Sequence, residues 1–176
     1  MMERVYLIED GLSYGERAVF GLLSALGRKG KVFVPDGLNK LSEDLRINEG
    51  SLSYYLRSLE RKGYLEINRR RLPSRILVAD IKLNFQKGKW IRVPRSFLFV
   101  GSPKERGLLL TLTSMAKPHK LFGGVKVKKA SFYLKDLISP DAKSLITLRK
   151  LLRSLQSKGF ILIERTRPFY VVRVVM

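Results

Sequence analysis

The chain of 176 residues carries 35 Lys and Arg against 15 Asp and Glu, which gives a formal net charge of +20. Its 45% apolar content excludes a disordered basic tail, and its length fits one ordinary domain or two small ones. With no Cys and the single histidine His119, disulfide scaffolds, cysteine nucleophiles and two-histidine metal sites are excluded.

The first half of the sequence predicts, in order, a strand, a helix, a strand, two more helices and a β-hairpin. A capping box of Ser13 and Glu16 starts the first helix, and Asn48 and Gly63 are the expected caps of the third. The hairpin has a basic tip at residues 70–74. The expected elements are residues 5–8, 14–26, 31–35, 38–45, 49–62, 64–69 and 75–83.

The second half repeats this plan. Residues 152–163 match residues 56–67 at seven of twelve positions, at an offset of 96. Ser102 and Glu105 repeat the capping box at an offset of 89, with Pro103 at the first helical position. The offset grows along the chain, so the second half contains insertions of three and four residues. After a joining segment at residues 84–89, the expected elements are a helix at 103–115, a strand at 125–127, a helix near 131–138, a long helix ending at 158, and a hairpin around 165–168.

Residues 41–65 resemble the helix-turn-helix of bacterial and archaeal winged-helix transcriptional repressors. In that family a hydrophobic residue and a turn are followed by a pair of small polar residues, an apolar residue, a Ser and a Leu, and a further Leu and a Gly come before the wing. The complete layout is similar to the tandem winged-helix replication initiators of plasmids and phages. We therefore expect an α+β protein of two tandem winged-helix domains, residues 1–86 and 87–176. A third tandem winged-helix family, the chromosome-condensation accessory proteins, is typically acidic, and this chain differs from it sharply.

In a winged helix the exposed face of the third helix enters the major groove of DNA, and the wing contacts the backbone or minor groove. In the first half Leu52, Leu56 and Leu59 form the core stripe of this helix, and Tyr55 is expected to be packing. The expected DNA contacts of the first half are Ser53, Tyr54, Arg57, Arg69, Arg70, Arg71 and Arg75.

The offset of 96 transfers the helix positions to the second half, with Leu148, Leu152 and Leu155 as the core stripe. Ser139 and Pro140 predict an earlier start for this helix, which brings Lys143 towards the DNA backbone. The expected DNA contacts of the second half are Lys143, Arg149, Lys150, Arg153, Arg165 and Arg167. Because residues 1–88 have a net charge of +5 and residues 89–176 of +15, we expect the second half to supply most of the phosphate affinity and the first half more of the discrimination.

The sequence contains no phosphate-binding Gly-rich loop and no metal-ligand cluster, so we expect no enzyme, no cofactor and no metal. The expected partner is double-stranded DNA, bound by a cytoplasmic, nucleoid-associated transcriptional regulator without a membrane segment. A replication initiator, a protein-interaction scaffold and a homodimer stay open. RNA also stays open, although the sequence lacks the aromatic stacking sheet typical of single-strand readers. The many Lys and Arg with two Gln and four Asn are also typical of thermophiles.

Overall fold

The computed structural model describes residues 1–74, 77–120, 124 and 126–176, and it is an α+β protein as expected. The first half contains β1 (Met2–Ile8), α1 (Tyr14–Leu26), β2 (Lys31–Val34), α2 (Gly37–Leu45), α3 (Glu49–Arg61), β3 (Leu65–Arg71) and β4 (Leu77–Leu83). The second half contains β5 (Gly88–Pro94), the 3-10 helix η1 (Arg95–Leu98), α4 (Pro103–Met115), β6 (Lys117–Lys120), β7 (Lys126–Phe132), the 3-10 helix η2 (Leu134–Leu137), α5 (Leu145–Ser157), β8 (Ile161–Arg165) and β9 (Tyr170–Val174).

Both expected capping boxes are confirmed. The hydroxyl of Ser13 accepts a hydrogen bond from the Glu16 amide, and the Glu16 carboxylate accepts one from the Ser13 amide at 2.7 Å. Ser102 and Glu105 repeat both bonds at the start of α4. Each pair satisfies amide groups that a helix leaves without intrahelical partners, so the first helix of each half starts where the sequence predicts.

The caps of α3 are confirmed as well, since the Asn48 side chain accepts from two amides and Gly63 has φ +77°. The predicted early start of α5 is wrong. The helix begins at Leu145, and Ser144 is its N-cap. Residues 139–142 instead form a tight turn closed by an antiparallel bridge, and the hydroxyl of Ser139 donates to Asp141. The Asp141 carboxylate accepts from the first two amides of α1, at 3.0 Å each, so this segment caps a helix of the other half.

The predicted helix near residues 131–138 is also wrong. Strand β7 continues through Phe132, and only the four residues of η2 are helical. Ser131 and Phe132 pair with Val171 and Tyr170 of β9, and the rings of Phe132 and Tyr170 stack at 5.7 Å. Sheet pairing therefore overrides the local helical pattern here. The predicted strand at residues 125–127 corresponds to β7, and Val125 lies outside the described residues.

Each half has a small antiparallel sheet. The strand order is β2-β4-β3 in the first half and β6-β7-β9-β8 in the second. Strands β3 and β4 form the first predicted hairpin, and β8 and β9 form the second. The second sheet is the first one with an additional edge strand, β6, within the region where the sequence repeat contains extra residues.

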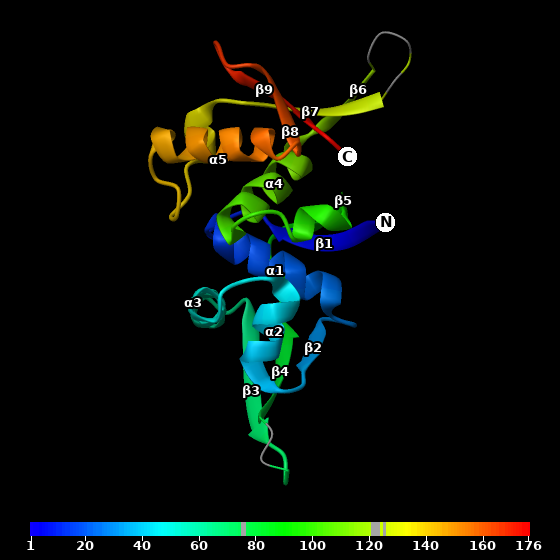
Figure 1. Ribbon diagram of the computed structural model, residues 1–176, viewed down its shortest axis with the longest axis vertical. Coiled ribbons are helices and arrows are strands. Elements are labelled where there is room, and N and C mark those ends of the chain that lie inside the picture. The colour runs from blue at the N-terminus through cyan, green and yellow to red at the C-terminus, as the bar shows by residue number, and fades with distance from the viewer. Residues whose placement is uncertain (75–76, 121–123, 125) are drawn as a thin grey trace.

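The two halves pack through their equivalent elements. Strand β1 pairs with β5 in an antiparallel ribbon from Met2↔Pro94 to Ile8↔Gly88, and α1 crosses α4 (Figure 1). An antiparallel pair of strands is related by a twofold axis, and the crossing of two equivalent helices obeys the same symmetry. The halves are therefore related by an approximate twofold axis, with the β3–β4 hairpin at one end of the elongated molecule and the β8–β9 hairpin at the other (Figure 1).

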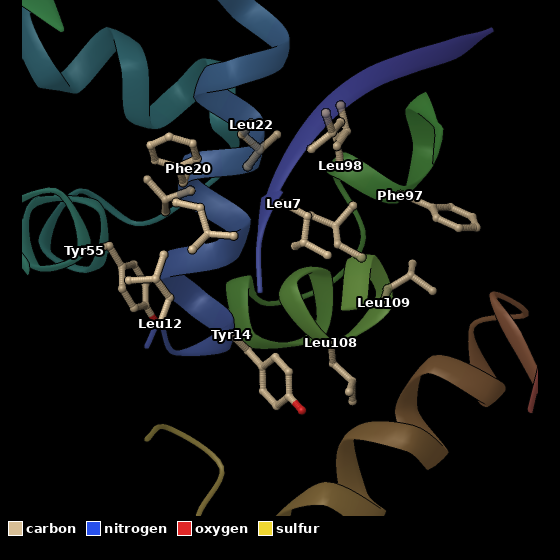
Figure 2. Packing of buried hydrophobic residues seen from close by; sticks show 14 of the residues in the cluster. Leu7, Leu12, Tyr14, Phe20, Leu22, Tyr55, Phe97, Leu98, Leu108 and Leu109 are labelled. Carbon is tan, nitrogen blue, oxygen red and sulfur yellow. The ribbon is translucent and has the colours of Figure 1, made fainter. Parts of the chain in front are cut away.

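The hydrophobic core is continuous across this junction. Phe20 and Leu22 of α1 lie in one cluster with Leu98 of η1 and with Leu108 and other residues of α4 (Figure 2). At the crossing, a Cβ atom on Gly107 would lie 1.8 Å from the carbonyl oxygen of Tyr14, so only glycine permits this approach of the two backbones. The close packing fixes the orientation of one half relative to the other.

Candidate nucleic-acid interface

Helix α3 separates a buried stripe from an exposed face. Leu52, Leu56 and Leu59 are buried, as predicted, because they recur at helical spacing on the side facing α1. Tyr55 is also buried, and its ring lies against Gly15, where a Cβ atom would meet it at 2.2 Å. On the other side Tyr54 is 68% exposed, Arg57 is exposed and Ser53 is half-buried.

Helix α5 repeats this division. Leu148, Leu152 and Leu155 are fully buried, and the expected contact residues Arg149, Lys150 and Arg153 are all exposed. The hydroxyl of Ser144 accepts from the Thr147 amide at 3.1 Å and caps the first turn. Three cations therefore project from one surface of this helix, where α3 presents a serine, a tyrosine and an arginine at the equivalent positions.

A buried carboxylate ties each of these helices to the first helix of its half. Glu16, in the capping box of α1, accepts hydrogen bonds from the Ser58 hydroxyl and from the Lys62 ammonium at 2.9 Å. Burial opposes the charged form of Glu16, but these donors outweigh it and lower its pKa below the usual range. The clamp fixes the C-terminal half of α3 against α1.

The second half contains the same clamp. Glu105 accepts from the Ser154 hydroxyl and from the Lys158 ammonium at 2.6 Å. Burial again opposes ionisation, and the hydrogen bonds from Lys158, Ser154 and Ser102 lower the pKa of Glu105 to about 2. The Ser and Lys of both clamps are among the identities of the sequence repeat, so the repeat preserves the position of α3 and of α5.

Three arginines of the first hairpin lie at the end of strand β3. Arg69, Arg70 and Arg71 are exposed, but Arg70 forms an ion pair with Asp80 at 3.2 Å. Successive strand residues face opposite sides, so Arg69 and Arg71 project from the face opposite Arg70. Arg75 lies outside the described residues. Two of the four expected cations on this hairpin are thus exposed without an ion pair among the described residues.

In the second hairpin Arg165 is the last residue of β8 and Arg167 lies in the turn that follows, and both are exposed. The guanidinium of Arg165 lies 5.8 Å from the ring centroid of Phe169, a cation–π contact that orients it. Lys143 is exposed but lies in the segment before α5, because the helix starts later than predicted. It therefore adds charge near the first turn of α5 without belonging to the helix.

Figure 1 shows α3 and α5 on the same side of the elongated molecule, away from the β1–β5 ribbon. The two hairpins extend from this side towards opposite ends. The approximate twofold axis explains the arrangement, because it relates α3 to α5 and one hairpin to the other. The two helices that carry most of the predicted helix contacts thus lie on one side, and in this view α3 is seen end-on and α5 from the side (Figure 1).

Two apolar residues on α5 were missed by the sequence analysis. Ile146 is 64% exposed and Leu145 is also exposed, and both lie in the first turn of α5. The equivalent residues of α3 are Glu49 and Gly50. The offset of 96 identifies these equivalents from the sequence alone. Exposed apolar side chains at the N-terminus of a groove-binding helix can contact the methyl group of thymine.

A third basic hairpin, formed by β6 and β7, was not predicted from the sequence. Strands β6 and β7 pair Lys117 with Lys129, and Lys120 and Lys128 are nearby in the same pair of strands. Lys129 forms an ion pair with Glu164 at 2.6 Å, while Lys117 and Lys120 are exposed. The equivalent place in the first half contains only the isolated bridge Arg28↔Lys31. This hairpin explains part of the charge excess of the second half.

A metal site and a membrane-spanning helix were sought in the described part of the chain. Residues 1–74, 77–120, 124 and 126–176 contain no group of three His, Cys, Asp or Glu side chains placed to bind a metal. Across those same residues, no helix combines the length and the apolar character that crossing a membrane requires. No protein-family model matches the sequence, and no curated protein matches it. We therefore infer the function from the sequence and geometry of this chain.

Proposed function

We propose that the protein binds double-stranded DNA through two winged helices, with α3 and α5 in the major groove and the β3–β4 and β8–β9 hairpins as wings, and that it acts as a transcriptional regulator. One observation supports this most strongly. In two separate helices, related by the internal repeat, the leucine stripe is buried and the predicted contact positions are exposed or half-buried, and both helices lie on the same side of the molecule (Figure 1).

The approximate twofold axis supports a specific form of target. Two recognition helices related by an approximate twofold axis match two half-sites in inverted orientation, as in a dimer of single-headed proteins, with half-site centres about 34 Å apart. The two winged helices, called the two heads below, differ in their contact positions. Ser53, Tyr54 and Arg57 of α3 correspond to Arg149, Lys150 and Arg153 of α5. We therefore propose that one chain occupies one asymmetric, inverted site.

The charge distribution supports a division of work between the heads. Net charges of +5 and +15 for residues 1–88 and 89–176 support a second half that supplies most of the phosphate affinity. The exposed face of α3 carries a tyrosine and an arginine beside the carboxylate of Glu49, which disfavours indiscriminate phosphate contact. The first half then contributes more of the sequence discrimination.

Selection from a random duplex library, repeated at two salt concentrations, tests the proposal. Enrichment of one inverted or asymmetric site supports the regulator. Enrichment of an array of direct repeats would replace the regulator with a replication initiator, and the absence of enrichment together with weak, salt-insensitive binding would leave a protein scaffold. An Arg57→Ala variant, carried through the same selection, should enrich a less defined sequence in one half-site only.

A further inference from the structure

The outer face of the β1–β5 ribbon carries an unusual group of side chains. In the antiparallel register Tyr6 lies opposite Trp90 and Arg4 lies opposite Arg92, so these four residues project from one face. Phe85, from the segment before β5, packs into the same group. We call these five residues, Arg4, Tyr6, Phe85, Trp90 and Arg92, the ribbon platform. None of them is in the set of expected duplex contacts.

The aromatic rings of the ribbon platform are partly open to solvent. The ring of Tyr6 is buried and contacts Phe85 and Trp90 at centroid distances of 4.8 Å and 5.2 Å. Trp90 is 41% exposed and Phe85 is 40% exposed. Tyr6 also contacts Phe20 of the core, so the exposed rings rest on a rigid base. A surface with two large, fixed and half-exposed aromatic rings is typical of a binding site.

The charge of the ribbon platform is positive, and no carboxylate of the described residues forms an ion pair with its two arginines. Arg4 and Arg92 are exposed and directly opposite each other, an arrangement that is unfavourable for two like charges in a sheet. Glu3, the one acidic residue of the two strands, projects from the other face, opposite Val93. The guanidinium of Arg4 lies over the Trp90 ring at 4.6 Å. A polyanion would relieve the repulsion between the two arginines.

We propose that the ribbon platform binds single-stranded nucleic acid. Unpaired bases stack on Phe85 and, once the Arg4 guanidinium moves from the Trp90 ring to a phosphate, on Trp90, and Arg92 pairs with a neighbouring phosphate. Duplex DNA does not fit this site, because its bases are already stacked and paired. The platform lies on the side of the molecule away from α3 and α5, so the proposal goes beyond duplex binding and does not depend on it (Figure 1).

Trp90 is the only tryptophan of the chain, so its fluorescence reports on this site alone. Titration of the full chain with a short oligothymidylate should quench the fluorescence to saturation, with an affinity that falls as salt is raised. An Arg4→Ala and Arg92→Ala double variant should weaken the binding about tenfold or more, and Phe85→Ala should do the same. Oligouridylate in a parallel titration shows whether DNA or RNA is preferred.

A matched control variant is Arg57→Ala with Arg153→Ala, which removes the same charge from the proposed duplex face. It should leave the quenching titration unchanged and weaken binding to a duplex. The proposal is overturned if oligothymidylate does not quench Trp90, if the control variant weakens quenching as much as the platform variant, or if anionic vesicles shift the fluorescence and oligonucleotides do not. Failure of duplex binding alone would overturn the proposed function and leave the platform standing.

Discussion

Arg106, from α4 in the second half, donates a hydrogen bond from its guanidinium to the carbonyl oxygen of Leu45 in the first half, at 2.6 Å. The same side chain donates to the carbonyl oxygens of Arg46, Val100 and Gly101 and is only 2% exposed. The guanidinium therefore joins the end of α2 to the start of α4. Its four hydrogen bonds compensate for the burial of a charge and fix the two halves to each other.

Replacement of Arg106 should cost a large part of the stability. Arg106→Ala leaves buried carbonyl groups without donors, so we expect the free energy of unfolding to fall by about 3 to 5 kcal/mol, measured by urea denaturation. Arg17 is the equivalent residue of α1. It donates to Thr111 at 3.1 Å and to Glu9, and it is half-buried. Arg17→Ala, as the control, should cost about 1 kcal/mol. Equal losses in both variants would contradict this explanation.

The clamp on Glu105 should make stability depend on pH. The pKa of this carboxyl falls from 4.5 to about 2 on folding, so its contribution is complete above pH 4.5 and is lost as the pH falls towards 2. The shift corresponds to about 3 kcal/mol. Urea unfolding of the wild type at a series of pH values should show this loss, and Glu105→Gln should show a flatter profile with lower stability at pH 7. An identical pH profile in the variant would rule out the clamp as its cause.

The crossing of α1 and α4 should not tolerate a side chain at Gly107. A Cβ atom there meets the Tyr14 backbone, so Gly107→Ala forces the halves apart and should lower the free energy of unfolding by about 3 kcal/mol or more. The control is Gly159→Ala, at a position with φ +77° and no atom within 4 Å of the added group. That variant should cost about 1 kcal/mol, from backbone strain alone. A Gly107→Ala protein as stable as the control would show that the crossing is not close-packed.

The elements that local physics determines could be predicted from the sequence. Ser13 and Glu16 mark the first helix because a capping box satisfies amides within four residues. The leucine stripes of α3 and α5 follow helical spacing, and the repeat transfers one to the other. The exposed positions of Arg57 and Arg153 follow from the same spacing. Each of these features depends on neighbours along the chain, and no distant partner decides it.

The errors occurred where distant partners decide the local structure. The sequence around Ser139 has the pattern of a helix N-cap. In the structure it forms a turn instead, and the carboxylate of Asp141 in this turn caps α1 of the other half. Phe132 lies in a helical pattern and is held in a strand by Tyr170. Tyr6 is far in the chain from Phe85 and Trp90, so no sequence pattern showed that the three rings form one group.

The two heads should differ in what they contribute to DNA binding. Arg57→Ala should reduce the ratio of affinities for a selected site and a scrambled duplex about tenfold, because a bidentate contact to one base is lost. Arg153→Ala should lower both affinities and leave the ratio nearly unchanged. Electrophoretic mobility shift titrations at one fixed salt concentration measure both ratios. The division of work fails if Arg153→Ala changes the ratio more than Arg57→Ala does.

The salt dependence of duplex affinity tests the central claim most directly. A variant with Arg149→Ala, Lys150→Ala and Arg153→Ala should flatten the slope of log affinity against log salt by about 2 to 3, since each lost phosphate contact contributes about 0.9. Its charge-matched control replaces Lys117, Lys120 and Lys128 of the β6–β7 hairpin by Ala and should change the slope less. An unchanged slope in the α5 variant, or an equal change in both, would contradict the assignment of α5 as a DNA-binding helix.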